Sequence, residues 1–264
     1  MKVLFIGDIV GNIGRKALKE TLPFLKTKFA PDVIIVNGEN AANGRGINQQ
    51  IAREFFEIGV HGITMGNHVW DQKEIFDFIE LEERMVRPAN FPAGTPGRGY
   101  TLIKANGKEL VIVNLQGRTF LPSLDCPFVS IDTILDQLKR KHKNILVDLH
   151  AEATSEKISL GWYLDGRISV LVGTHTHVQT NDDVILPLGT AYITDVGMVG
   201  SRDGVLGMER SAVLQKFMTQ MPVRFTVAEG KWQLHAVLIE INEDTGKSTA
   251  IQKIRMYEDQ FRME

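Results

Sequence analysis

The sequence predicts an α/β protein in which two packed sheets are flanked by helices. Short apolar runs that end in Gly, Asn, Asp or His alternate with segments whose apolar residues recur every three or four positions. Such alternation is typical of βαβ units and of a largely parallel sheet. Beyond about residue 189 the pattern changes to period two, which indicates further strands. No linker or repeat interrupts the chain, so we expect residues 1–264 to form a single domain.

Three apolar runs in the first part of the chain each lead into polar residues, and a helical stripe follows each run. The expected strands cover residues 3–6, 33–36 and 62–65. The expected helices carry apolar stripes within residues 18–29, 51–58 and 75–79. Pro31 ends the first helix, because proline lacks the N–H that a helix interior needs.

The rest of the chain repeats this alternation less regularly and then turns to strands alone. Buried strands are expected at residues 110–115, 145–149 and 170–172, with a helix at residues 131–138. Period-two strands are expected at residues 191–194, 223–227, 232–241 and 250–256. The polar, glycine-containing segment 242–247 joins the last two strands as a hairpin.

The bulk composition restricts the partners and the compartment. The 264-residue chain has a net charge of -2, so no global basic field marks it as a binder of long nucleic acids. Any nucleotide that it handles is therefore expected to be a small substrate. Its single cysteine, Cys126, excludes an intrachain disulfide and suits a reducing compartment. The N-terminal apolar run is too short for a signal peptide, and no stretch approaches the roughly 20 apolar residues that cross a bilayer. We expect a cytoplasmic protein without membrane contact, in which apolar residues of the late strands leave room for a homo-oligomer.

Polar side chains follow five of the expected strands. In open α/β sheets, ligands bind beyond the carboxyl ends of the strands. The set offers carboxylate, amide and imidazole donors without a thiolate, which favours Mn, Fe, Zn or Co and contains too many imidazoles for a typical calcium site. It exceeds the needs of one tetrahedral ion and suits two ions bridged by a carboxylate. The five positions are Asp8; Glu39 with Asn40; Asn67 with His68; His150; and His175 with His177.

The segment 173–177, Gly-Thr-His-Thr-His, is the most informative of the five. We expect Gly173 to free the backbone for a turn, and the i, i+2 spacing predicts that His175 and His177 point to the same side of an extended segment. Each position also has a structural interpretation. Asp8 and Asn67 can cap helices or turns, Glu39 with Asn40 can form a turn, and the histidines can be hydrogen-bonded without a metal.

Together these motifs form the basis of a family resemblance. Gly7-Asp8, Gly66-Asn67-His68, His150 and the segment 173–177 resemble, in order and spacing, the signature of the calcineurin-like metallophosphoesterases. Two departures are present: the first block, 7–10, lacks the usual histidine, and Glu39 stands where the bridging aspartate is usual. With the segments 66–70, 175–180 and 194–198, these departures resemble a narrower group, the YmdB-type bacterial phosphodiesterases. The resemblance implies the metallophosphoesterase fold, a four-layer αββα sandwich of two mixed sheets flanked by helices.

The resemblance also implies a di-metal site. One metal would take Asp8, Glu39, Asn40 and His177, with Asn40 supplying an oxygen in place of the missing histidine. The second would take Glu39, Asn67, His150 and His175, so that Glu39 bridges. The implied metals are iron or, as the alternative, manganese, and the implied substrates are phosphodiesters, with 2′,3′-cyclic nucleotides leading. Hydroxide formed between two such ions would attack in line, and His68 is our candidate for the general acid that protonates the leaving oxygen.

Two other functions share these residues. One is a regulatory metal-binding scaffold without turnover, and the other is a phosphomonoesterase such as a protein phosphatase. Two further side chains remain open in role. Asp148 is interpreted as a solvated or ion-paired carboxylate, with orientation of a ligand imidazole as the alternative. Arg45 is a candidate contact for phosphate, with a mobile surface arginine as the alternative.

Overall fold

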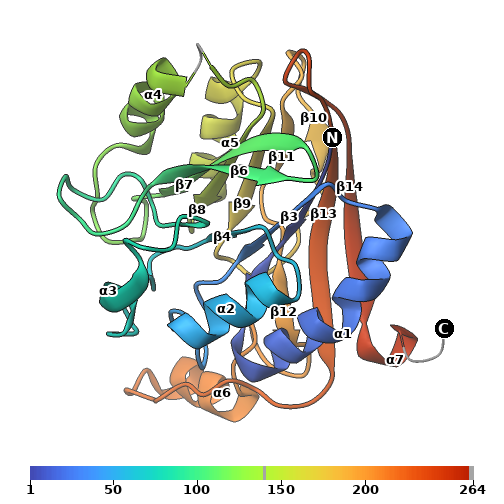
Figure 1. Ribbon diagram of the computed structural model, residues 1–264. Helices are drawn as coiled ribbons and strands as arrows, with labels where there is room; N and C mark the ends of the chain where they lie inside the picture. The colour runs from blue at the N-terminus through green and yellow to red at the C-terminus, as the bar shows by residue number, and fades with distance from the viewer. Residues whose placement is uncertain (139–140, 262–264) are drawn as a thin grey trace.

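Two mixed β-sheets lie face to face between two layers of helices in the computed structural model, which describes residues 1–138 and 141–261 (Figure 1). The two sheets are called sheet 1 and sheet 2 below. Sheet 1 holds the first strands of the chain and the C-terminal hairpin, and sheet 2 holds the strands between them. The strands that precede the predicted site residues are thus divided between the two sheets.

Sheet 1 is built around a long strand from the C-terminal part of the chain. Its strands are β1 (Lys2–Ile6), β2 (Asp8–Ile9), β3 (Val33–Asn37), β4 (Gly62–Thr64), β5 (Met85–Val86), β12 (Met198–Ser201), β13 (Trp232–Asn242) and β14 (Lys247–Tyr257). The order is β2-β12-β13-β1-β3-β4-β5, and β14 pairs with β13. Strands β1, β3, β4 and β5 run parallel, whereas β13 is antiparallel to β1, β12 and β14.

Sheet 2 has a parallel centre with an antiparallel strand at each edge. Its strands are β6 (Tyr100–Ala105), β7 (Lys108–Gln116), β8 (Ile145–His150), β9 (Val170–Thr174), β10 (Val184–Ile185) and β11 (Ala191–Ile193). The order is β10-β11-β9-β8-β7-β6, in which β7, β8, β9 and β11 run parallel. Because parallel strands end at the same edge, β8 and β9 present their last residues side by side.

The helices form the two outer layers and one projecting arm. They are α1 (Gly11–Phe29), α2 (Gln49–Glu57), α3 (Ile75–Phe78), α4 (Pro127–Leu138), α5 (Thr154–Leu164), α6 (Arg210–Thr219) and α7 (Glu258–Phe261). Helix α1 packs on β12 and β13 of sheet 1 and ends at Phe29, after which Ala30 adopts a left-handed conformation. Among the described residues no helix has the length and apolar character needed to cross a membrane.

Three apolar layers hold these elements together. The first packs α1 and α2 against sheet 1, the second lies between the two sheets, and the third packs α4 and α5 against sheet 2. Each layer removes a continuous apolar face from water, which is the main favourable contribution to folding. The predicted four-layer sandwich of two mixed sheets flanked by helices is therefore confirmed. Only the largely parallel sheet that the strand–helix alternation indicated needs correction, because each sheet also contains antiparallel strands.

Several element predictions need correction. The strand expected at residues 223–227 is wrong, because this segment returns from α6 largely exposed and only Val227 forms an isolated bridge, to Met208. Helices α5 and α6, whose apolar stripes are weak, were not predicted from the sequence, and neither were the single turn α7 and the strands β2, β5, β6, β10 and β12. The helix expected around residues 75–79 is a single turn, α3.

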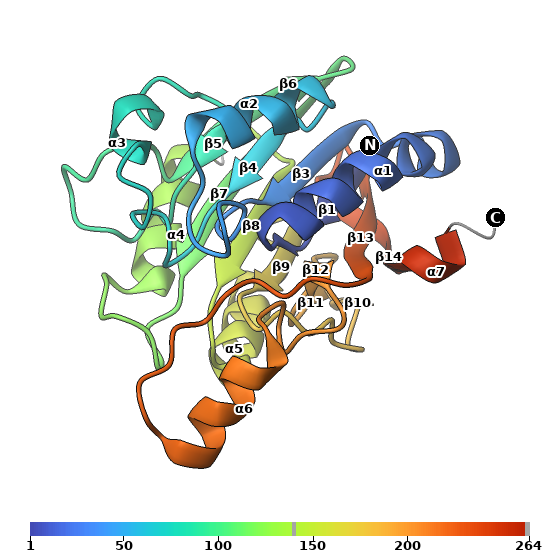
Figure 2. The same cartoon turned by 90° about the horizontal axis from the view of Figure 1, so that it is seen from below.

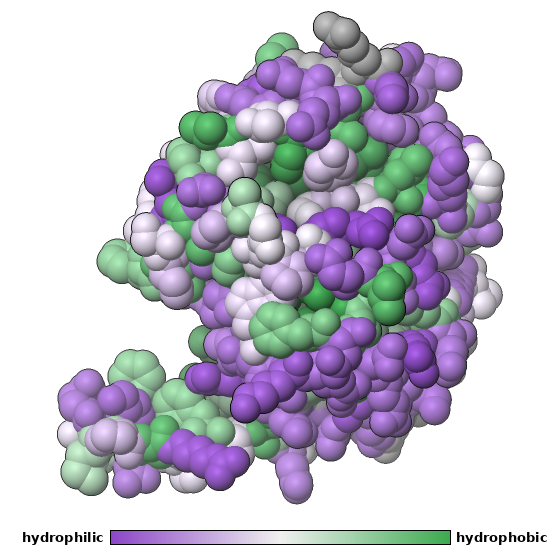
Figure 3. Space-filling model, turned by 60° about the vertical axis from the view of Figure 1, so that its left-hand side comes forward, coloured by the Kyte–Doolittle hydropathy of each residue, from purple (hydrophilic) through white to green (hydrophobic). Residues whose placement is uncertain are grey.

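Helix α6 and its return segment project from the body of the molecule. Figure 2 shows α6 standing away from both sheets, and the space-filling view of Figure 3 shows a separate lobe at the lower left, where α6 lies. The segment 203–228, which carries α6 and whose two ends lie against the body at Val10 and Gly11, is called the α6 arm below. Its exposed apolar side chains are Val205, Leu206, Leu214, Phe217, Met218, Met221 and Phe225.

Candidate metal centre

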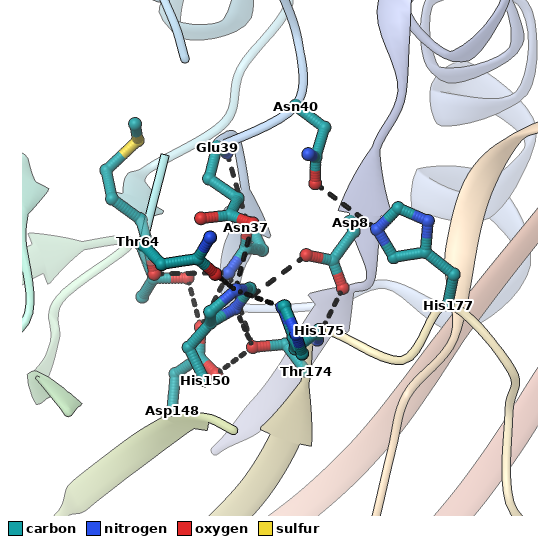
Figure 4. Close-up of polar contacts among 12 residues, drawn as sticks. Asp8, Asn37, Glu39, Asn40, Thr64, Asp148, His150, Thr174, His175 and His177 are labelled. Atoms are coloured by element: carbon teal, nitrogen blue, oxygen red, sulfur yellow. Dashed lines mark hydrogen bonds and ion pairs between the residues drawn. The ribbon is translucent and has the colours of Figure 1, made fainter. Parts of the chain in front are cut away.

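The polar strand ends of both sheets meet at one edge of the sandwich (Figure 4). Sheet 1 contributes Asp8 from β2, Glu39 with Asn40 after β3, and Asn67 with His68 after β4. Sheet 2 contributes His150 at the end of β8 and His175 with His177 after β9. The structure thus brings all eight predicted site residues to the same region, although they lie up to 169 positions apart in the sequence, from Asp8 to His177.

One group of donors converges on the Nε2 atom of His150. This atom lies 2.9 Å from Glu39 Oε1, 3.0 Å from Asn67 Oδ1 and 3.0 Å from His175 Nδ1. The ligand atoms of Glu39, His150 and His175 all lie within 4.8 Å of one another. Two ligands about 2.1 Å from a metal at a right angle are ~3 Å apart, so these separations match those of ligands around one cation.

Hydrogen bonds behind His150 determine which of its nitrogens faces this group. The Thr174 hydroxyl donates to Asp148 Oδ1 at 2.7 Å and lies 2.9 Å from His150 Nδ1. Because the hydroxyl proton is directed at Asp148, Nδ1 must donate to the Thr174 oxygen. In a neutral imidazole, Nε2 then carries a lone pair that points at the donor group.

Asp148 is the centre of this buried network rather than a solvated carboxylate. It is fully buried, and it accepts hydrogen bonds from the Thr64 hydroxyl at 2.5 Å and the Asn37 amide at 3.1 Å as well as from Thr174. Burial raises the pKa of Asp148, while His150 and the three hydrogen bonds oppose that rise. The interpretation of Asp148 as a solvated residue is wrong, and the alternative, orientation of His150, agrees with the geometry.

His175 is fixed in the same manner from the solvent side. Its Nε2 atom lies 3.0 Å from Glu152 Oε2, which can only accept a proton when ionised. The Nδ1 atom therefore carries a lone pair, and this lone pair faces His150 Nε2. Burial and the neighbouring His150 lower the pKa of His175 to about 3, so the ring stays neutral.

The donor group therefore consists of acceptor atoms that repel one another unless a cation lies between them. The residues therefore fit a metal ion, which would remove the repulsion between these acceptors. Without a metal, a proton on His150 removes it. Burial lowers the pKa of His150, but the facing Glu39 outweighs it and raises the value to about 9. Burial likewise raises the pKa of Glu39, and the facing His150 more than reverses this, to about 2.

A second group lies beside the first, around His177. Its Nδ1 donates to the Leu206 carbonyl at 3.0 Å, so in the neutral ring the Nε2 lone pair faces Asn40 Oδ1 at 3.3 Å. The Asn40 amide nitrogen donates to the Gly44 carbonyl at 2.9 Å, which turns its oxygen toward His177. Two acceptors again face each other, as expected for ligands of a cation.

Asp8 lies between the two groups in Figure 4. Its Oδ2 accepts the backbone N–H of His175 at 3.2 Å, whereas its buried Oδ1 has no hydrogen-bond partner among the described residues. Burial raises the pKa of Asp8 to about 7, against the opposing effect of His177 and His150. The nearest basic group is His150 Nδ1, 3.9 Å from Asp8 Oδ1. A buried carboxylate oxygen without a hydrogen-bond donor is costly, and a cation would remove that cost.

The geometry of the segment 173–177 differs from the expected extended run. Strand β9 ends at Thr174, and His175 and His177 have positive φ values of 100° and 63°. The His175 ring therefore lies in the group around His150 and the His177 ring in the group beside Asn40. The prediction that both rings point to the same side of an extended segment is wrong. Gly173 lies inside β9, and glycine is needed there because a Cβ atom would overlap the Thr194 carbonyl oxygen.

His68 lies next to the donors without joining either group. Its backbone N–H donates to Glu39 Oε2 at 3.1 Å, and its Nδ1 lies 3.0 Å from Asp71 Oδ2. The Asp71 carboxylate also lies 3.7 Å from Arg45 Nη1. This arrangement leaves Nε2 of His68 free to exchange a proton with a bound molecule.

Apart from Asp148, the partners that orient these side chains were not predicted from the sequence. Asp71 lies only three positions after His68, which is a local signal for that pair, whereas Glu152 lies 23 positions before its partner His175 and gives none. Thr174, Thr64 and the Leu206 carbonyl carry no such signal, because their roles depend on the packing of distant strands.

Comparison with known proteins agrees with the class that the fold and the site define. The two-sheet sandwich is the fold of the calcineurin-like phosphoesterases, as shown by the YfkN phosphoesterase of Bacillus subtilis, with a TM-score of 0.57 at 10% identity over 98% of this chain and 90% of that one. Within this class, residues 4–254 match the model of the YmdB-like protein family, and the chain belongs to that family. The prediction of a phosphoesterase-type enzyme is confirmed by a relative that is 57% identical over 98% of the chain and is named as a phosphodiesterase.

Similar proteins cover the whole chain. A protein of Bacillus subtilis (strain 168) named 2′,3′-cyclic-nucleotide 2′-phosphodiesterase is 57% identical over 98% of both chains. A solved structure of a hypothetical protein from Thermus thermophilus has a TM-score of 0.92 at 42% identity and covers 98% of this chain and 100% of its own. A structure described as a novel phosphatase of Mycoplasma pneumoniae has a TM-score of 0.92 at 34% identity, covering 100% and 96%.

Proposed function

We propose that this protein is a di-metal phosphodiesterase that hydrolyses 2′,3′-cyclic nucleotides. The observation that carries the proposal is the convergence of acceptor atoms on His150 Nε2, from Glu39, Asn67 and His175, at an edge shared by both sheets. Opposed acceptors of this kind are stabilised by a cation between them, and a metal would take the place of the proton that His150 otherwise holds. The substrate class is inferred from the name of the Bacillus subtilis relative.

The proposed ligands divide between two cations. We assign Asp8, Glu39, Asn40 and His177 to one, and Glu39, Asn67, His150 and His175 to the other. The division is supported by two separate sets of opposed acceptors, one around His150 and one between His177 and Asn40. Oxygen and imidazole donors without thiolate suit iron or manganese, and we propose iron with manganese as the alternative.

The proposed mechanism uses His68 as the general acid. When bound, the two cations would activate a water molecule and neutralise the charge of the phosphate as it is attacked. His68 then donates a proton to the departing ribose oxygen. Asp71 holds the opposite nitrogen of the ring, and the bond from the His68 backbone to Glu39 fixes its position relative to the ligands. Arg45, beside Asp71, is our candidate for a contact with the substrate phosphate.

The remaining expectations concern the state of the protein in the cell. We infer a cytoplasmic location from the single, unpaired Cys126, which suits a reducing compartment. We take residues 1–264 to act as one domain, because both sheets supply the proposed ligands. The homo-oligomer stays a prediction. The exposed apolar side chains of the α6 arm are the candidate contact surface, and light scattering of variants in these side chains would test it.

The test is hydrolysis of 2′,3′-cyclic AMP by protein reconstituted anaerobically with iron or manganese. We expect metal-dependent turnover that falls by a factor of about 10²–10⁴ in His68→Ala, the usual contribution of a general acid. The matched control is His142→Ala, since His142 lies outside the site. Two bound ions without turnover would favour the regulatory scaffold, and faster hydrolysis of phosphomonoesters would favour a phosphomonoesterase; either result contradicts the proposal.

A further inference from the structure

A buried ion pair holds the residue that separates the two histidines after β9. That residue is Thr176, whose backbone N–H and hydroxyl both donate to Asp195 Oδ2, at 3.1 and 2.8 Å. The same oxygen lies 2.7 Å from Lys157 Nζ. Asp195 Oδ1 accepts the Gly197 N–H at 2.8 Å, so both carboxylate oxygens are engaged.

The burial of this pair is unusual for charged side chains. Both Lys157 and Asp195 have fully buried side chains, and Lys157 is among the largest such residues in the protein. Lysine and aspartate are rarely buried to this extent, and the loss of hydration generally cancels the attraction between the charges. Stability alone is therefore a weak explanation for the pair.

The backbone that the pair holds is conformationally unfavourable. His175 and His177, on either side of Thr176, have φ values of 100° and 63°. Residues with side chains seldom adopt such values, and each one costs of order 1–3 kcal/mol unless the surroundings enforce it. Asp195 supplies that enforcement through two hydrogen bonds to Thr176, and Lys157 fixes Asp195 from helix α5.

Close packing around the Lys157 side chain keeps water away from the ion pair. Its side chain passes beneath the end of β9, where a Cβ atom on Gly173 would lie 2.9 Å from Lys157 Cδ. The ammonium group consequently reaches Asp195 along a route that excludes water. The carboxylate that holds the turn at residues 175–177 is thus paired with a buried side chain of helix α5.

We propose that Lys157 and Asp195 are positioning residues, which aim His175 and His177 at their two donor groups and so set the affinity of the site for divalent cations. The inference rests on the proposed function, in that it takes both histidines as ligands. The pair acts through Thr176 and touches no substrate. Loss of partners of this kind typically costs a factor of 10–100 in metal affinity.

The test is a calorimetric titration of metal-free protein with Mn²⁺, comparing wild type with the double variant Lys157→Met, Asp195→Asn. The double variant removes both charges together, so no unpaired charge remains buried, and the side-chain shapes are kept. We expect Mn²⁺ affinity to fall about 10–100-fold while the circular dichroism spectrum stays unchanged. Wild-type affinity in the folded double variant would overturn the proposal.

Two further variants make the result decisive. Asp165→Asn is the matched control, because Asp165 is also buried and accepts backbone N–H bonds, from Leu188 and Thr190, near the opposite end of β9. We expect its Mn²⁺ affinity to equal that of wild type. Thr176→Val removes only the hydroxyl bond and should weaken binding in the same direction, by a smaller factor. If the double variant does not fold, unchanged affinity in Thr176→Val overturns the proposal.

The titration separates this inference from the proposed function. Metal affinity is measured without substrate, so its outcome does not depend on which ester is hydrolysed. Wild-type protein that binds Mn²⁺ but leaves cyclic nucleotides intact would contradict the proposed substrate, while the Lys157–Asp195 proposal would still stand or fall on the affinities alone.

Discussion

At the residue scale, Thr174 shows how a neutral hydroxyl can fix the tautomer of a histidine. Its proton is directed at Asp148, which obliges His150 Nδ1 to donate to the hydroxyl oxygen. We expect Thr174→Val to lower Mn²⁺ affinity about 10–100-fold, because His150 loses this partner. Thr174→Ser keeps the hydroxyl and serves as the control. Equal affinities of the valine and serine variants, measured by calorimetry, would contradict this account.

The pair formed by His68 and Asp71 supports a second prediction at the same scale. Asp71→Asn keeps the size of the side chain but removes the charge 3.0 Å from His68 Nδ1. We expect kcat for 2′,3′-cyclic AMP to fall by roughly tenfold or more, with Mn²⁺ affinity unchanged, since Asp71 supports proton transfer rather than metal binding. Asp77→Asn, on the exposed face of α3, is the matched control. Loss of metal from the Asp71 variant would count against the proposed role.

At the scale of the elements, the strand ends in the site are glycine-rich because the elements approach closely there. A Cβ atom on Gly66, two residues after β4, would overlap Glu39 Oε2 and His150 Cδ2. We expect Gly66→Ala to abolish measurable Mn²⁺ binding while the secondary structure is retained. Gly94→Ala is the control, because a Cβ atom there meets no atom within 4 Å and only its positive φ is strained. Wild-type metal content in Gly66→Ala, by elemental analysis, would contradict the prediction.

The sequence predicts the strands of this fold better than its helices and loops. The runs at β3, β8 and β9 are apolar on both faces, as expected of parallel strands covered on both sides, and their boundaries are nearly correct. Helices α5 and α6 present weak apolar stripes, since α5 buries a lysine and α6 stands on the arm. Period-two alternation at residues 223–227 gives a strand only when a neighbouring strand is available for pairing. Among the described residues, this segment forms one isolated bridge, between Val227 and Met208.

The types of the site residues are predictable from sequence, but their directions are not. Donor types and strand-end positions suffice to name the candidates from Asp8 to His177. The positive φ values of His175 and His177 depend on Asp195, which lies 18 positions beyond His177 and on a different loop. A contact of that kind leaves no periodic pattern in the sequence.

At the scale of the whole molecule, a buried histidine outside the site makes stability depend on pH. Burial and the nearby Arg255 lower the pKa of His235 to about 4, against an ordinary value of 6.5. Above pH 6.5 the ring is neutral in both the folded and the unfolded chain. Between these two values the unfolded chain binds a proton that the folded chain refuses, so the free energy of unfolding falls as the pH falls, by at most ~3 kcal/mol.

The measurement is urea unfolding of metal-free protein at about pH 7 and about pH 4.5. We expect His235→Gln to lose less stability than wild type between the two conditions, because glutamine does not titrate. Other groups contribute equally to both proteins, so only the difference between them is interpreted. An identical loss in the two proteins would contradict the prediction.

The central position of β13 in sheet 1 has a consequence for biosynthesis. This strand separates β1 from β12, and β12 is the partner of β2, which carries Asp8. The proposed ligands end at His177, yet β13 begins only at Trp232, 55 positions later (232 − 177). A nascent chain emerges from its N-terminus onward, so every proposed ligand is translated before β13. Strand β2, with Asp8, can take its place in the sheet only after β13 has joined β12 to β1. The ion is therefore expected to enter a finished protein rather than to template a growing one.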